Sequence, residues 1–341
     1  MNWVLRRVGQ SLFVLWAVLT ISFALIELMP GGPADFLRAQ LMSQEDSMGD
    51  MDMEHINRQV ELYTNIHPDL PIWEKYMDYM IATVQGDFGR SIYYARPNSE
   101  IILQALPWTV FVVGIALVLT FVINIVIGAI MAYKEGSRFD VGMTFFSILS
   151  TSIPYYIAAI GLLVLFAFGL PYEILPIGGR YNPNYEPWTL DWIGSVIAHA
   201  TLPIISFVFI GVGSGALIMR GNCIQVLGSD YLRVGRLRGL SDTTLSMEYV
   251  GRNAVLPMYT SFMIAIGNVF GGAVILEEIF VYPGIGYYMF QAVSARDYTL
   301  LMGTFVVITV AVVVCLFIAD LTYGWIDPRV SEKGGGESEA F

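Results

Sequence analysis

The chain has few charged residues. Lys, Arg, Asp and Glu make up 14% of its 341 residues, whereas soluble domains carry about a quarter. Hydrophobic residues make up 55%, and the mean hydropathy is +0.61. Because a soluble domain needs far more polar surface than this, the composition indicates an integral membrane protein.

Sequence motifs for chemistry at a single site are also missing. There is no GxxxxGK[ST] loop to cradle a nucleotide phosphate, and none of the three lysines follows a glycine. Cys223 and Cys315 are isolated in apolar surroundings, which is typical of small hydrophobes and not of a disulfide. No metal-ligand spacing, nucleophile–base pair or basic, aromatic patch for nucleic acid appears. We therefore expect no catalytic residue, no metal and no cofactor, and we assign any ATP hydrolysis to a partner protein.

Six apolar runs are long enough to cross a hydrocarbon core of about 30 Å, which takes roughly 20 helical residues. They are Val8–Met29, Leu106–Tyr133, Val141–Leu170, Leu202–Cys223, Pro257–Leu276 and Leu300–Tyr323. The sequence thus predicts an all-α polytopic membrane protein with six transmembrane helices. The first run could be a cleaved signal peptide, but its length and the lack of a small-residue cleavage site favour a retained helix.

These runs predict four segments. They are an N-terminal transmembrane helix at 1–29, a large extracytoplasmic segment at 30–105, a five-helix core at 106–329 and a flexible tail at 330–341. Basic residues predict the orientation, because short loops rich in Lys and Arg stay in the cytoplasm. Arg6, Lys134, Arg220 and Arg236 all fall on one side of a six-span arrangement. We therefore expect a multi-pass protein of the cell membrane with both termini in the cytoplasm.

The segment Ser229–Pro257 places four arginines between two long apolar runs, in a chain of net charge -11. Ser229 and Asp230 can cap a short helix, and Gly239 can end that helix in the left-handed conformation. Ser241 and the residue after it can cap a second short helix. One interpretation is a basic loop bound to anionic lipid headgroups, although that interpretation leaves the glycine between the two helices unexplained.

This segment resembles the cytoplasmic coupling loop of ABC importer permeases of the dipeptide/oligopeptide/nickel family, in the type of subunit that begins with an N-terminal membrane anchor. The matching residues are Asp230, Tyr231, Arg233, Arg236, Gly239, Leu240, Ser241, Arg252, Asn253, Ala254, Leu256 and Pro257, and the departures are Val234, Gly235, Leu237 and Tyr249. The resemblance implies a loop between helices 4 and 5 that a partner ATPase grips. The coupling residues would be Asp230, Tyr231, Arg233, Arg236, Arg238, Gly239, Arg252, Asn253 and Pro257, with Tyr231, Val234 and Leu237 as apolar contacts.

A second resemblance to the same family lies in EEIFVYPGIG, which starts at Glu277, and in the RDY that follows at Arg296. It implies a translocation path that includes Glu277, Phe280, Pro283, Gly284 and Gly286. A carboxylate at the edge of a helix bundle is unfavourable unless it faces water or a partner. Glu277 therefore either lines the path or caps the turn by accepting backbone N–H bonds, and both interpretations stay open.

Three other patterns have weaker implications. The segment GDFGRS, which starts at Gly86, resembles a family motif and is expected to cap the helix bundle on the outside, with substrate contact as the alternative. Asn124 and Asn268 can form hydrogen bonds between helices, and the spacing of Gly211 and Gly215 lets helices approach closely.

The resemblance implies a permease subunit of an ATP-driven importer, with peptides as the expected substrate. Its partners would be a second homologous permease, two ATP-binding subunits, an extracytoplasmic solute-binding protein and the lipid bilayer, with no nucleic acid. One alternative is a secondary transporter driven by an ion gradient through Glu277 or His199. Another is the same architecture importing nickel chelates or short sugars.

Overall fold

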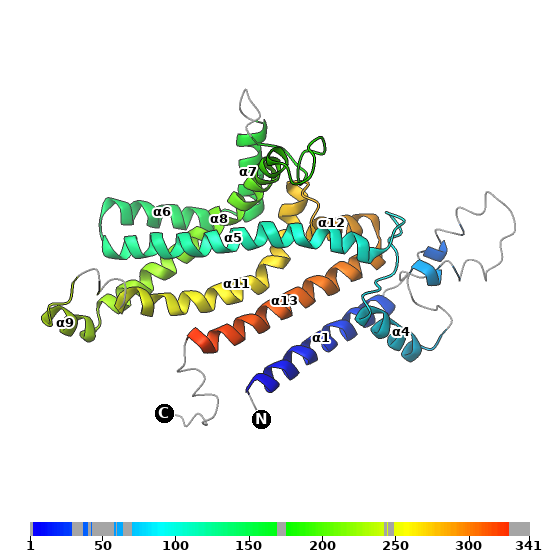
Figure 1. The fold of residues 1–341 in the computed structure, drawn as a ribbon, viewed down its shortest axis with the longest axis horizontal. Helices are drawn as coiled ribbons and strands as arrows, with labels where there is room; N and C mark the ends of the chain where they lie inside the picture. The colour runs from blue at the N-terminus through cyan, green and yellow to red at the C-terminus, as the bar shows by residue number, and fades with distance from the viewer. Residues whose placement is uncertain are drawn as a thin grey trace. The chain divides into compact units, whose positions relative to one another are not determined.

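The structure is a computed structural model that describes residues 3–28, 37–39, 42, 58, 60–63, 70–168, 175–241, 244 and 249–326. Its named elements (Figure 1) are α1 (Trp3–Glu27), α4 (Ile72–Val84), α5 (Asn98–Tyr133), α6 (Arg138–Ser152), α7 (Tyr155–Leu163) with the π-helical turn η1 (Val164–Phe168), α8 (Leu190–Leu227), α9 (Asp230–Leu237), α11 (Arg252–Ile279), α12 (Ile285–Ala295) and α13 (Tyr298–Ile326). Within these ranges the only strand-like pairing is one isolated bridge between Arg90 and Pro97. The chain is therefore mostly helical, as predicted, while the predicted tail at 330–341 lies outside the described residues.

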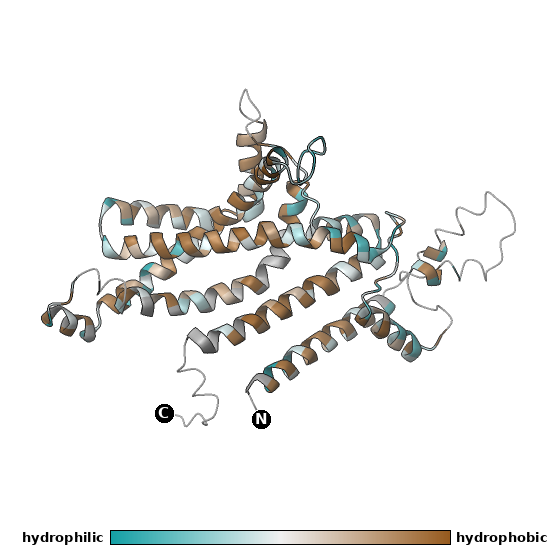
Figure 2. Ribbon diagram, viewed as in Figure 1, coloured by the Kyte–Doolittle hydropathy of each residue, from teal (hydrophilic) through white to brown (hydrophobic). Residues whose placement is uncertain are grey.

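Several helices have the length and apolar character of membrane spans. Four helices in the described part meet both conditions, or up to five if the bent pair of α6 with α7 and η1 counts as one span. Figure 2 shows hydrophobic residues along most of α5, with hydrophilic residues gathered at the turn that joins α5 to α6. The predicted run Pro257–Leu276 lies within α11, and the count of six spans stays a prediction.

The predicted run Val141–Leu170 is not one continuous helix. It divides at Ile153 and Pro154 into α6 and α7, which are bent by 100° at this break. Proline lacks the N–H of a helix interior and disfavours helical dihedrals in the residue before it. Ile153 accordingly has an extended backbone with φ -92° and ψ 123°. The prediction counted this run as one span by its hydrophobic length and did not include the break at the proline; the bent pair can still count as one span.

Two of the described helices, α6 and α8, begin after a residue whose side chain accepts a hydrogen bond from an N–H group of the first turn. Thr189 accepts a bond from the Trp192 N–H at the start of α8, and Ser137 accepts one from the Asp140 N–H at the start of α6. Such caps typically contribute about 1 kcal/mol each. The polar residues just before these apolar helices therefore fix where the helices begin.

The chain divides into two compact units, which are treated separately below. The first contains Met1–Thr109 and Pro283–Phe317, and the second contains Val110–Tyr282 and Ile318–Phe341. In the second unit α6, α7 and α11 each pack against α8. In the first unit α4 packs on α1, where Lys75 donates to Glu27 at 2.8 Å and Tyr76 shares a hydrogen bond with Thr20.

Candidate functional site

The predicted coupling segment contains the short helix α9, which ends at Leu237. Gly239 follows with φ +76°, the left-handed conformation expected after a helix end. Ser241 accepts a bond from the Thr244 N–H at 3.2 Å, the geometry of a helix cap, while the predicted second short helix lies largely outside the described residues. Gly239 and Ser241 thus match the prediction, whereas the Ser229 hydroxyl donates back to the Val226 carbonyl at 2.5 Å, so the prediction that Ser229 caps α9 is not confirmed.

One side of α9 is fixed to the rest of the second unit through Leu232, which is only 2% exposed. Leu232 belongs to a buried apolar cluster whose members come from the ends of α5, α8 and α11 as well as from α9 itself. The members are Ala132, Met219, Cys223, Leu232, Val250, Ala254 and Met258. One buried cluster therefore packs α9 against the ends of the three longer helices.

The other side of α9 is open. Val234 is 49% exposed and Leu237 is 82% exposed, and the predicted coupling residues Asp230 and Arg238 are exposed as well. Pro257 lies inside α11 and is also exposed. The predicted side chains of Tyr231, Arg233, Arg236, Arg252 and Asn253 lie outside the part that the structure describes.

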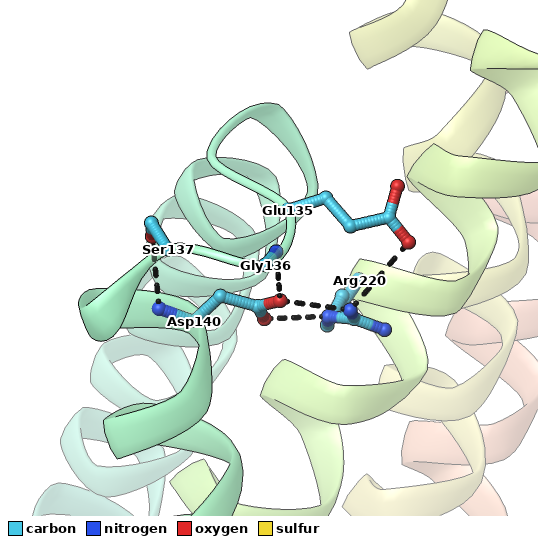
Figure 3. Close-up of polar contacts among 5 residues, drawn as sticks. All are labelled: Glu135, Gly136, Ser137, Asp140 and Arg220. Atoms are coloured by element: carbon cyan, nitrogen blue, oxygen red, sulfur yellow. Dashed lines mark hydrogen bonds and ion pairs between the residues drawn. The ribbon is translucent and has the colours of Figure 1, made fainter.

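An ion pair close to the coupling segment was not predicted from the sequence. Arg220, two turns before the end of α8, donates from Nε to Asp140 Oδ1 at 2.6 Å and from Nη2 to Asp140 Oδ2 at 2.9 Å (Figure 3). The Gly136 N–H donates to the same carboxylate at 3.0 Å, and Glu135 lies 3.7 Å from Arg220. Two parallel N–H to O bonds of this kind fix orientation as well as distance. The pair therefore ties the α5–α6 turn to the helix that leads into α9.

Of this ion pair, local sequence spacing indicates a role for Asp140 but not for Arg220. Ser137 and Asp140 have the spacing of a capping box, in which an acidic residue in the first helical turn reaches back toward the chain before the helix. The structure shows a variant of this arrangement, in which Ser137 accepts from the Asp140 N–H while Asp140 accepts from the N–H of Gly136, one residue before the cap. Arg220 could not be matched to it from local spacing, because 80 residues separate the two partners.

Two of the predicted path residues, Glu277 and Phe280, lie at the C-terminal end of α11. Glu277 and Phe280 are both buried, and the Glu277 carbonyl accepts from the Tyr282 N–H at 2.7 Å. Burial raises the pKa of the Tyr282 phenol, the Glu277 carboxylate raises it further, and Arg180 lowers it. Gly179, in the chain between η1 and α8, donates its N–H to the Val281 carbonyl at 3.0 Å. The second unit therefore joins the end of α11 to the loop that contains Arg180.

The remaining predicted path residues belong to the first unit, where Gly284 precedes α12 and Gly286 lies buried inside it. Pro283 is the first residue of this part of the chain. The Ile285 N–H at the start of α12 donates to Thr109 Oγ1 at 2.8 Å, a buried bond to α5. The structure thus separates the five predicted path residues into two groups, Glu277 with Phe280 and Pro283 with Gly284 and Gly286.

Asp297, at the start of α13, connects the GDFGRS segment with the RDY motif, which lie far apart in the sequence. Its Oδ2 accepts from Ser91 Oγ at 2.6 Å and from the Tyr93 N–H at 3.1 Å, so the GDFGRS segment is tied to the RDY motif. Its Oδ1 accepts from Thr299 Oγ1 at 2.9 Å and from the Leu300 N–H at 3.1 Å. Asp297 is 1% exposed. These bonds support the structural interpretation of GDFGRS, because the polar groups of Ser91 and Tyr93 serve the fold.

Comparison with known proteins identifies the class of this membrane protein. The family described as "Binding-protein-dependent transport system inner membrane component" matches residues 124–332. The chain is 30% identical to "Oligopeptide transport system permease protein AppB" of Bacillus subtilis (strain 168), over 96% of this chain and 98% of that protein. It is 31% identical to "Probable D,D-dipeptide transport system permease protein DdpB" of Escherichia coli (strain K12), over 97% and 98%. It is 29% identical to "Di/tripeptide transport system permease protein DppB" of Pseudomonas aeruginosa (strain UCBPP-PA14), over 98% and 99%.

The chain belongs to the family of binding-protein-dependent transport system inner membrane components. It is a membrane permease component of an ABC importer, a class whose permease subunits have no ATPase site of their own. The family prediction made from the segment at 229–257 is therefore confirmed.

Proposed function

We propose that this chain is the peptide-translocating permease subunit of an ATP-driven importer and that segment 229–257 receives the motion of the ATPase. The three relatives are named for the transport of oligopeptides, D,D-dipeptides and di- or tripeptides, which supports peptides over nickel chelates or short sugars. The partners would be a second homologous permease, two ATP-binding subunits and an extracytoplasmic binding protein. Both termini and segment 229–257 would face the cytoplasm.

The observation that carries the coupling role is the two-sided character of α9. Leu232 is buried among the ends of α5, α8 and α11, while Val234 and Leu237 are left exposed. A helix bound only to lipid headgroups would need its basic residues and no such internal attachment. A helix with one side packed against the protein and one exposed apolar side can bind a partner and pass the partner's movement to the helices it packs against.

The arrangement supports a mechanism based on two conformations. An ATPase pair that closes on ATP would displace α9, and the cluster around Leu232 would pass this displacement to the three longer helices. Because packed interfaces switch between discrete arrangements, a small shift at α9 can change which side of the membrane the path is open to. Glu277 would lie near the outer part of this path.

Substitution of Leu237 by Asp tests the proposal. The side chain is 82% exposed, so the change should leave the amount of permease in the membrane within twofold of wild type. A charge at an apolar contact should, however, weaken binding of the ATP-binding subunits. We expect at least a tenfold loss in ATP-driven uptake of a tripeptide by proteoliposomes and a matching loss of ATPase copurified with the permease.

Leu190→Asp provides the matched control, because Leu190 is 86% exposed and begins α8 far from α9 in the chain. This variant should retain both uptake and copurified ATPase. Wild-type uptake and ATPase binding in Leu237→Asp would show that the exposed side of α9 has no coupling role. Uptake that follows an ion gradient and ignores ATP would support the secondary transporter.

A further inference from the structure

Helix α4 has a stripe of apolar side chains that is open in the first unit. Trp73 is 63% exposed, Met77 is 50% exposed and Val84 is 82% exposed, and no residue of α4 is buried. With about 100° of rotation per residue, these side chains lie within about 40° of one another around the helix axis. Ile81, at the edge of the stripe, is 51% exposed. A helix with one concentrated apolar side is stabilised when another apolar phase covers that side.

The contacts between α4 and α1 fix the level of α4 relative to the membrane. The apolar span in α1 runs from Leu5 to Leu25. Tyr76 shares a hydrogen bond of 2.8 Å with Thr20, which lies inside the span, about 7 Å along the helix axis from its end. Phe23 packs against the same tyrosine with ring centroids 5.4 Å apart. Helix α4 therefore lies beside the last turns of the span (Figure 1), where the hydrocarbon core meets the headgroups.

The charged residues of α4 fit such a boundary. Lys75 pairs at 2.8 Å with Glu27, just beyond the end of the span, and the two side chains are only 14% and 23% exposed. A paired charge is tolerated at the edge of the hydrocarbon, where a single charge is unfavourable. The other charged residues of α4 are Glu74 and Asp78, and Asp78 lines a groove of about 530 Å³ together with Asp87. A groove with these carboxylates suits water and not hydrocarbon.

The three faces of α4 have the angular order that a helix in the bilayer surface requires. The face on α1, where Tyr76 and Tyr79 both pack against Phe23, lies about 130° from the apolar stripe. Glu74 and Asp78 lie opposite the middle of that arc. When the acidic face points to water, the face on α1 and the apolar stripe both point toward the membrane. Trp and Tyr residues are also enriched at this level of membrane proteins.

The apolar surface of α1 is open at the same level. Ile21 is 57% exposed and Leu25 is 65% exposed, both near the end of the span that α4 contacts. The edge of the bilayer is an apolar phase that reaches both helices, because α1 itself crosses it. A lipid surface therefore accounts for the open side chains of α1 and of α4 together.

We propose that α4 lies in the bilayer surface at the C-terminal end of α1. Trp73, Met77 and Val84 insert among the acyl chains close to the headgroups, while Glu74 and Asp78 remain in water. In the proposed topology this is the extracytoplasmic surface. Through its contacts with α1, the surface helix sets the depth at which the first span lies in the membrane. This role is independent of the transported substrate.

The test measures the accessibility of nitroxide labels in the full complex, reconstituted with its partner subunits into vesicles of palmitoyl-oleoyl phosphatidylcholine. The background carries Cys223→Ala and Cys315→Ala, and the labels are placed at Met77→Cys and Asp78→Cys. These neighbours have almost the same position along the helix but differ in face by about 100°. Oxygen concentrates in hydrocarbon, whereas a charged nickel complex stays in water. The ratio of oxygen to nickel collisions should be about tenfold higher at position 77 than at position 78, because a surface helix buries its apolar face by about 5–10 Å.

A second matched pair lies about two turns further along α4. Val84→Cys belongs to the apolar stripe, and Gln85→Cys lines the acidic groove. A label at Leu12→Cys, inside the α1 span and 61% exposed, provides the hydrocarbon reference. A measurement without new cysteines uses the difference in tryptophan fluorescence between wild-type complex and Trp73→Phe complex. Brominated lipid should quench that difference signal.

Three results would overturn the lipid contact. Equal, low oxygen-to-nickel ratios at both members of each pair would place the stripe in water. Low collision rates with both reagents at positions 77 and 84 would mean that protein covers the stripe, such as the second permease or the binding protein. A Trp73 difference signal that brominated lipid does not quench would reject the contact even if the cysteine variants did not assemble.

Discussion

Asp140 in the second unit and Asp297 in the first are both buried aspartates at the start of a long helix, but their charges are balanced in different ways. Asp140 faces a cation, since Arg220 donates two bonds to it. Asp297 has four neutral donors, two hydroxyl groups and two backbone N–H groups. Burial is similar, at 3% and 1% exposure. Helix position and burial therefore do not determine how a carboxylate is satisfied.

The difference has a consequence for each site. A carboxylate held by neutral dipoles depends on every donor being in place, because hydroxyl and N–H dipoles together replace the water that it lost. A carboxylate held by a two-bond arginine depends mainly on that arginine. The Asp297 site should therefore not tolerate substitution of Asp297, and the Asp140 site should tolerate replacement of both Asp140 and Arg220 together.

Tyr94 also belongs to the Asp297 site, because its N–H donates to Ser91 Oγ. Burial raises the pKa of the Tyr94 phenol to about 12.

The largest expected effect comes from Asp297→Ala. The change leaves four donors without their acceptor, and each buried unsatisfied group costs about 1–3 kcal/mol, although hydroxyl groups can find other partners. We expect a loss of about 4 kcal/mol in unfolding free energy, measured by thermal unfolding of the purified subunit in detergent. Asp191→Ala, at an exposed position in the first turn of α8, should lose less than about 1 kcal/mol. If Asp297→Ala and Asp191→Ala lost equal amounts of unfolding free energy, the stabilising effect of Asp297 would come from its position at a helix start and not from its four donors.

Arg220→Ala should have the second largest effect. Removing one partner of a buried pair costs about 3–5 kcal/mol, but the Arg220 side chain is 26% exposed, so water can partly replace it. We expect a loss of about 2 kcal/mol in the same unfolding measurement. The exposed Arg138, in the same turn as Asp140, provides the control, and Arg138→Ala should change stability by less than about 0.5 kcal/mol.

The double variant Asp140→Asn with Arg220→Gln extends the comparison. The two new amides can form a neutral hydrogen bond with each other. The double variant should therefore lose less unfolding free energy than the sum of the losses measured for Asp140→Asn alone and for Arg220→Gln alone. A strictly additive result would show that the two side chains do not act as a pair.

The sequence predicted the features that depend on neighbouring residues. Length and apolar composition located α5 and α8, and the left-handed conformation of Gly239 followed from its place after a short helix. The break at Pro154 was also local, and the prediction missed it because the apolar run was treated as a single unit. Proline chemistry would have placed the break correctly.

The links between distant segments could not be predicted in this way. Ser91 and Asp297 are 206 residues apart, and only the packed fold brings their side chains together. The same holds for Arg220 and Asp140, where the capping pattern on one side contains no information about the partner. The family resemblance identified both RDY and GDFGRS but did not indicate that one binds the other.

The smallest expected effect is that of Glu135→Gln, and it tests whether the Asp140 site is a pair or a network. Glu135 lies 3.7 Å from Arg220, and its side chain is 61% exposed, so water screens most of the attraction. The variant should lose less than about 0.5 kcal/mol, both alone and in combination with Arg220→Ala. A loss near 2 kcal/mol would mean that Arg220 needs both carboxylates. The Asp140 site would then depend on several partners, as Asp297 does, and the contrast between the two aspartates would disappear.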